Sequence, residues 1–120
     1  MSAPTAAERI ALMARATAEL MDRTGALLGV AQQAEATEPA IAARAQAGRL
    51  DTQRVLEGFW RRMEADGLLS PDVDIDWLSV TGATLGQAET YLMLAKVIHW
   101  DADTYAAWLE TTWAHLGGIH

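Results

Sequence analysis

The sequence predicts an all-α fold of five helices in a single domain that spans residues 1–120. Alanine is abundant, β-branched residues are sparse and proline occurs at only three positions, a composition that favours helix. Apolar residues recur three and four positions apart along most of the chain, which is the spacing of one helical face. A chain of 120 residues can bury one core but still gains stability from association with a second copy.

The first helix is predicted to begin at the capping box 5–8, because the Thr5 hydroxyl and the Glu8 carboxylate can each accept a backbone hydrogen bond there. We expect it to end at Gly25, where glycine can adopt the left-handed cap conformation. Its apolar stripe consists of Ile10, Met13, Thr17, Leu20 and Met21. A short second helix is expected over residues 27–31, fading in the polar stretch 32–37.

The third helix is predicted over Pro39 to Asp66, since proline is tolerated in a first helical turn and Gly67 follows as a stop signal. Its first half is rich in alanine and offers only Ile41 and Leu50 as large apolar groups. We therefore expect that half to pack weakly, as a mobile segment or a lid. The second half has a core stripe formed by Val55, Leu56, Phe59, Trp60 and Met63.

The fourth helix is predicted from about Asp74 to His99, with aspartates at its start, where the helix dipole favours negative charge. It is apolar nearly all round, which predicts burial on every side and hence a second subunit. Gly82 and Gly86 lie inside it, and each costs about 1 kcal/mol relative to alanine. They either admit a close helix, permit a bend or leave room for a ligand.

The fifth helix is predicted to begin at the cap Asp101 and to end at Gly117-Gly118. One of its faces is unusually rich in aromatic and apolar groups for a terminal helix. So much aromatic area suggests a surface that a partner covers.

Charge and composition exclude several classes of protein. The formal net charge of −7 argues against a nucleic-acid surface, since neutralising phosphate needs clustered basic residues. The only basic cluster is formed by Arg54, Arg61 and Arg62. It is interleaved with acidic residues, and we interpret it as a solvent-exposed helix face. Without cysteine there is no disulfide or thiolate site, and no apolar run reaches the roughly 18 residues of a membrane span. We expect a cytoplasmic protein that does not contact the membrane.

No catalytic residue, cofactor or metal site is predicted. The chain has no phosphate-binding glycine loop, and none of its serines has a recognisable base partner. His99, Asp101 and Asp103 could be read as metal ligands, but helix capping explains the two aspartates without a metal.

Two segments carry a family resemblance. One is Trp100-Asp101-Ala102-Asp103-Thr104-Tyr105-Ala106-Ala107-Trp108-Leu109, and the other is the turn Gly67-Leu68-Leu69-Ser70-Pro71 with acidic residues and an apolar helix after it. With the order of helices, they resemble the C-terminal regulatory domain of TetR-family transcriptional regulators along the whole chain. The resemblance implies a homodimer whose last two helices form a four-helix bundle with those of the symmetry mate. It also implies a small-molecule cavity among the first four helices.

In that family a helix-turn-helix head precedes the regulatory domain and binds the operator. Here Met1 lies almost at the start of the first regulatory helix. The resemblance therefore implies transcription regulation by a domain that does not bind nucleic acid through this chain alone.

Two sets of residues are assigned to these functions. The expected dimer interface is Leu85, Tyr91, Leu92, Tyr105, Trp108, Leu109, Thr112, Trp113 and Leu116, the alternative being that these are core residues of a monomer. The expected pocket for a small hydrophobic effector is Met13, Thr17, Phe59, Trp60, Met63, Trp77, Thr81 and Thr84, the alternative being close packing.

The predicted function is thus an effector-binding and dimerisation domain of TetR type without its DNA-binding head. A helical dimerisation or adaptor protein with no small ligand is the alternative. An enzyme built on the same scaffold is a third hypothesis, which the sequence favours less than the other two.

Overall fold

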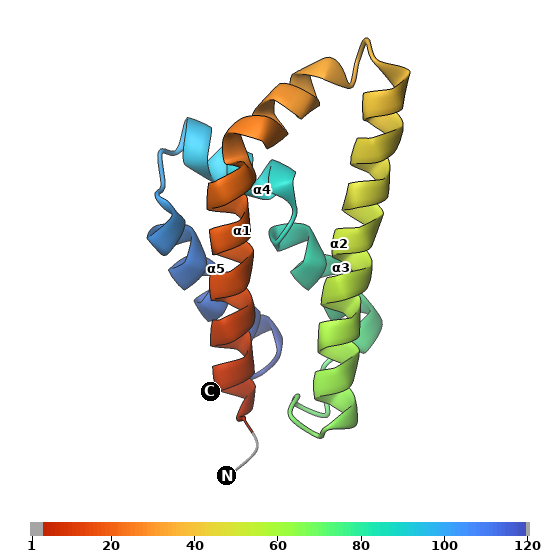
Figure 1. Ribbon diagram of the computed structural model, residues 1–120. Coiled ribbons are helices and arrows are strands. Elements are labelled where there is room, and N and C mark those ends of the chain that lie inside the picture. The colour runs from red at the N-terminus through yellow and green to blue at the C-terminus, as the bar shows by residue number, and fades with distance from the viewer. Residues whose placement is uncertain (1–3, 120) are drawn as a thin grey trace.

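The computed structural model describes residues 4–119, and within that range it is built of helices without any strand (Figure 1). The all-α class is confirmed. In chain order the elements are α1 (Ala6–Ala34), α2 (Pro39–Ala65), α3 (Ile75–Leu85), α4 (Ala88–Leu92), the π-helical turn η1 (Met93–Val97) and α5 (Ala102–Leu116). The molecule is elongated, with extents of 47 × 27 × 26 Å.

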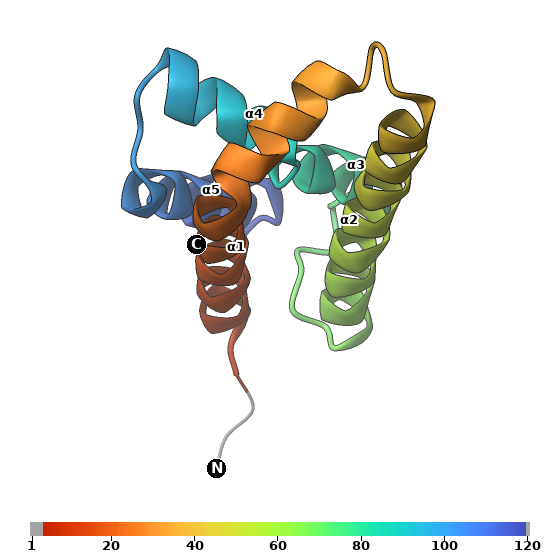
Figure 2. The ribbon, with the colours of Figure 1, turned by 45° about the horizontal axis from the view of Figure 1, so that its top comes forward.

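The helices form two groups, and the connection between α1 and α2 spans them at the top of the molecule (Figures 1 and 2). α1 packs along α5, and α2 packs along α3. The last turns of α1, orange in Figure 1, lean over α4 toward the start of α2. α1 and α2 therefore form the two arms of an arch, with α3 and α4 behind it.

Local capping signals predict the helix starts correctly. The backbone N–H of Glu8 donates to Thr5 Oγ1 over 3.2 Å, which completes the expected capping box. Asp101 Oδ1 accepts from the backbone N–H of Thr104 over 2.8 Å, and this hydrogen bonding holds the pKa of Asp101 below its ordinary value. Gly67 follows α2 with φ of +71°, as its role as a stop signal requires.

The expected end of the first helix at Gly25 is wrong, because α1 continues to Ala34 and includes the predicted second helix. Gly25 serves close packing instead of capping: a Cβ there would lie 3.3 Å from Tyr91 Cε2. A Cβ at Gly29, one turn later, would lie 2.6 Å from Lys96 Nζ. These glycines let α1 cross closely over α4 and η1.

The expected single helix from Asp74 to His99 is also wrong, because it breaks after Leu85. Thr90 Oγ1 donates to the Thr84 carbonyl over 2.7 Å and satisfies an acceptor at the end of α3. Residues 93–97 then form η1, and His99 follows with φ of 66°. Within the single chain this segment is not buried on every side.

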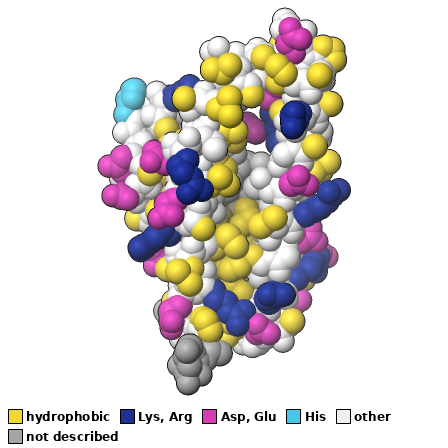
Figure 3. Space-filling model, in the orientation of Figure 1, with side chains coloured by type: hydrophobic (Ala, Val, Ile, Leu, Met, Phe, Trp, Pro, Cys, Tyr) yellow, Lys and Arg dark blue, Asp and Glu magenta, His cyan; other side chains and the backbone are white. Residues whose placement is uncertain are grey.

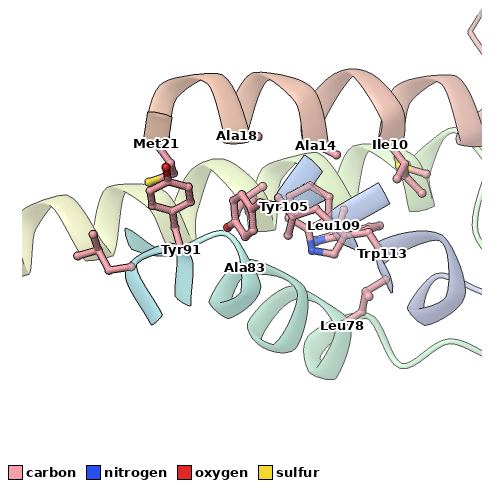
Figure 4. Packing of buried hydrophobic residues seen from close by; sticks show 14 residues of the cluster. Ile10, Ala14, Ala18, Met21, Leu78, Ala83, Tyr91, Tyr105, Leu109 and Trp113 are labelled. Atoms are coloured by element: carbon pink, nitrogen blue, oxygen red, sulfur yellow. The ribbon is translucent and has the colours of Figure 1, made fainter. Parts of the chain in front are cut away.

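The core lies where α1, α2, α3 and α5 meet (Figure 4). Tyr105 and Trp113 are fully buried with their polar atoms satisfied: Tyr105 Oη donates to the Leu85 carbonyl over 2.7 Å, and Trp113 Nε1 donates to the Gly82 carbonyl over 2.9 Å. Burial raises the pKa of Tyr105 above its ordinary value. The largest fully buried side chains are Ile10, Trp60, Met63, Leu78, Tyr105, Leu109 and Trp113.

This core corrects part of the expected dimer interface. Tyr105, Leu109 and Trp113 have no exposed surface, and Tyr91 and Leu92 are only 7% exposed. The helices of the chain itself cover these five side chains. They are therefore core residues, which is the alternative that the sequence left open.

The two glycines of the fourth segment let helices approach closely. A Cβ on Gly82 would lie 2.6 Å from Trp60 Nε1, and one on Gly86 would lie 2.8 Å from Leu56 Cδ1. α2 therefore packs on α3 through these two positions, and Gly86 also ends α3. Of the expected explanations, a close helix applies at both positions, and in place of the expected bend the helix ends at Gly86.

The close contact at Gly82 predicts a large cost for a small substitution. Gly82→Ala should lower the free energy of unfolding by about 1–3 kcal/mol, because the rigid indole of Trp60 must move to admit the methyl group. Gly58→Ala, on α2 with open space around the new Cβ, should raise stability by up to about 1 kcal/mol. Urea unfolding measures both, and equal stability of the two variants would contradict the packing described.

Candidate ligand-binding groove

A groove opens between the two arms of the arch, with a volume of about 630 Å³. We call it the arch groove. Its walls are the second half of α1 and the first half of α2, and its floor is residues 87–89 with Leu92. The space-filling view shows the surface hollowed between the arms, with hydrophobic and charged side chains around the hollow (Figure 3). The main lining residues are Leu20, Thr24, Leu27, Leu28, Ala31, Glu35, Ile41, Arg44, Ala45, Gly48, Arg49, Thr52, Gln87, Glu89 and Leu92.

The walls of the groove are predominantly apolar. Leu27 on α1 is 71% exposed and Ile41 on α2 is 36% exposed, so large aliphatic groups face the groove without covering each other. Small residues of α2 keep the space open: no atom lies within 4 Å of a Cβ built on Gly48. The alanine-rich half of α2 is thus a groove wall. Its expected mobility stays a prediction.

Arg49 holds the floor and both arms together. Its Nη2 donates to Glu35 Oε1 over 2.6 Å, and its Nε donates to Glu89 Oε1 over 2.9 Å. Glu35 ends α1 and Glu89 lies in the first turn of α4, so a single guanidinium of α2 links three helices. The hydrogen bonds to Glu35 and Glu89 raise the pKa of Arg49, which keeps it cationic.

Gln87 fixes the floor against α2. Its Nε2 donates to the Arg49 carbonyl over 2.9 Å and to Gln53 Oε1 over 3.1 Å. The break after α3 makes this possible, because Gln87 is the N-cap of α4 and lies outside both helices. The polar side chains of the floor, Gln87 and Glu89, are therefore already hydrogen-bonded to α2, and the remaining lining is available to the apolar part of a ligand.

The expected pocket residues do not come together. Trp60 and Met63 are fully buried in the core, and Trp77 is 53% exposed on α3. Thr81 is half-buried and Thr84 is exposed on the same helix. Thr17 Oγ1 donates to the Met13 carbonyl over 2.8 Å. None of these lines the arch groove.

Met13 and Phe59 do share a second, shallower groove between the lower parts of α1 and α2, of about 650 Å³. At its end Arg9 Nη1 donates to Asp66 Oδ2 over 2.7 Å. Two of the eight expected pocket residues therefore lie in one hollow, which is separate from the arch groove.

The other expected interface residues, Leu85, Trp108, Thr112 and Leu116, are half-buried. The apolar surface that α3 leaves open is formed by Trp77 and Val80, with Thr81 and Thr84 on the same face. Their spacing of three and four residues puts them opposite the buried Leu78 and Gly82.

Sequence reasoning missed Arg49, Glu35 and Gln87. Arg49 shares a face of the first half of α2 with Ala45, Thr52 and a second arginine, Arg44. Two arginines on an otherwise uncharged helix face are the signal that could have found it. Its partners come from positions 14 and 40 residues away, which no local pattern connects.

Other kinds of site find no support within residues 4–119. That part of the chain contains no group of three or more His, Cys, Asp or Glu side chains placed to hold a metal ion. None of its helices combines the length and the hydropathy that crossing a bilayer requires.

Comparisons with protein-family models, with curated proteins and with solved structures found no match to this chain.

The contacts of Arg49 predict that it orders the upper arms. Arg49→Leu should speed amide hydrogen exchange in the last turns of α1, about residues 28–35, because Glu35 loses its tie to α2. Arg54→Leu is the control, since within residues 4–119 the Arg54 side chain pairs only with Asp51, on the exposed face of α2. Hydrogen exchange with mass spectrometry measures both, and unchanged exchange in the Arg49 variant would contradict the link.

Proposed function

We propose that this chain is an effector-binding and dimerisation domain of TetR type, and that the arch groove binds a small hydrophobic molecule. The observation that supports it best is the groove itself. Its volume of about 630 Å³ is within the range of about 300–1,000 Å³ that is usual for ligand sites. Apolar walls with a few fixed polar groups are also usual there.

The position of the groove suits an effector. It lies between the first two long helices and above α4, among the elements where the TetR resemblance implies a cavity. A molecule that enters between the arms contacts α1, α2 and α4 at once. Its binding can therefore change the angle between the arms and the position of α4.

For the homodimer we propose the open face of α3 as a main contact. The face formed by Trp77, Val80, Thr81 and Thr84 carries no charge. In a symmetric pair of antiparallel α3 helices centred between Val80 and Thr81, each Trp77 faces the partner's Thr84. A large side chain then meets a small one on both sides of the two-fold axis, which is the self-complementarity that a symmetric dimer needs.

The same geometry offers a route from effector to dimer. The floor of the groove begins at Gln87, two residues after the end of α3. A shift of α4 on ligand binding is transmitted through this short connection to the proposed interface helix. DNA recognition would then belong to a separate module, because the net charge of −7 disfavours phosphate contacts by this domain.

The alternative function is a dimerisation or adaptor module without a small ligand. The exposure of Trp77 favours it as much as it favours the first proposal, since both require a partner surface. Dimerisation without binding of any apolar molecule would favour the adaptor.

Filling the groove tests ligand binding. N-phenyl-1-naphthylamine, a neutral apolar fluorophore, should bind the wild type with enhanced emission, and Gly48→Phe should weaken binding at least ten-fold because the new ring occupies the groove. Gly58→Phe is a matched control on the same helix, also with open space around its Cβ but outside the groove. Absence of binding to the wild type, or equal binding to both variants, would overturn this site.

Charging the α3 face tests the dimer. The wild type should run as a dimer in light scattering at micromolar concentration, and Trp77→Asp should shift it to the monomer, because an unpaired carboxylate is costly in an apolar contact. Leu50→Asp, at an exposed position of α2 outside the groove lining, should leave the dimer intact. A monomeric wild type would refute dimerisation, and a dimeric Trp77→Asp variant would refute this interface.

A further inference from the structure

The charged side chains around the arch groove differ in how they are engaged. Glu35, Glu89 and Arg49 are bound to each other through the hydrogen bonds of the Arg49 guanidinium. Arg44 also lines the groove, but its side chain has no hydrogen bond or ion pair with any other residue of the described chain. Arg44 is thus the one charged lining group that an incoming molecule can engage without breaking an existing contact.

The other charged groups of the groove, in contrast, are engaged with each other. Glu35 at the end of α1 and Glu89 in the floor both accept from Arg49, and the Gln87 amide donates to the Arg49 carbonyl and to Gln53. The Thr24 hydroxyl donates to the Leu20 carbonyl over 2.8 Å. The body of a ligand therefore gains by being apolar, because a polar body would have to displace these bonds.

From this arrangement we propose that the ligand of the arch groove is an amphipathic anion, an apolar chain or ring system with a carboxylate head that pairs with Arg44. This inference rests on the proposed function and specifies the chemistry of its effector. Arginine suits the role, because its planar guanidinium can donate two parallel hydrogen bonds to one carboxylate.

The overall charge of the chain does not oppose this. The net charge of −7 repels anions at long range, but salt at physiological strength screens exposed charges beyond about 8 Å. The contact with Arg44 is shorter than that and decides the local preference. A cationic head would have to compete with Arg49 for Glu35 and Glu89, because both carboxylates already accept from its guanidinium.

Decanoate and 1-decanol form a matched pair of probes, used below their aggregation limits at pH 7.5. Both should displace N-phenyl-1-naphthylamine from the wild type, with decanoate binding about five-fold tighter, the gain expected for one exposed ion pair of about 1 kcal/mol. Arg44→Gln should reduce that ratio to about one and leave the affinity for decanol unchanged. Arg44→Lys should keep part of the preference.

Arg62→Gln is the control variant. Arg62 is on the same helix, its side chain likewise has no hydrogen bond or ion pair within the described chain, and it lines the lower groove instead. This variant should keep the preference for decanoate.

The outcomes separate the two proposals. Binding of neither probe to the wild type contradicts the proposed function. Equal binding of both contradicts the inference about the head group and leaves the function standing. Loss of the preference in Arg62→Gln but not in Arg44→Gln also overturns the inference, because the head then lies in the lower groove. Decylamine binding more tightly than decanoate would overturn it as well.

Discussion

The structure depends on the close approach of three helices at Gly82. The carbonyl of this residue accepts from Trp113 of α5, and its Cα, without a side chain, lies against the indole of Trp60 of α2. Trp60 and Trp113 in turn meet edge to face, with ring centroids 6.0 Å apart. Two groups of helices, α1 with α5 and α2 with α3, are thus joined in one core, and because they are joined there, the arms above can diverge and leave a groove.

The fold class and most helix ends could be predicted from the sequence, because capping is a local property. Thr5, Asp101 and Gly67 act within three or four residues of themselves, so a single sequence contains the whole argument. Gly25 shows the limit of this reasoning. Whether a glycine ends a helix or admits a neighbouring helix depends on which residue packs against it. At Gly25 that residue is Tyr91, which lies 66 positions away in the chain, so no local sequence pattern indicates the contact.

The candidate site was less predictable, for a related reason. Helical spacing groups residues into faces but does not say which face meets which. The positions of Tyr105, Leu109 and Trp113 were correctly assigned to one apolar face, yet their partners are α1 and α3 of the same chain. Conversely, Trp77 was assigned to a pocket and lies on the surface. The polar atoms of the buried Tyr105 and Trp113 donate to the carbonyls of Leu85 and Gly82, and these acceptors are in position only once α3 is in place.

The pairing of α1 with α5 has a consequence for synthesis of the chain. These helices are the first and the last, and α5 contributes three of the largest fully buried side chains. A nascent chain that ends before Trp113 therefore holds α1 with its apolar stripe uncovered and no core to close it. The core cannot close until α5 packs on α1, and until then the stripe of α1 is exposed apolar surface of the kind that favours aggregation.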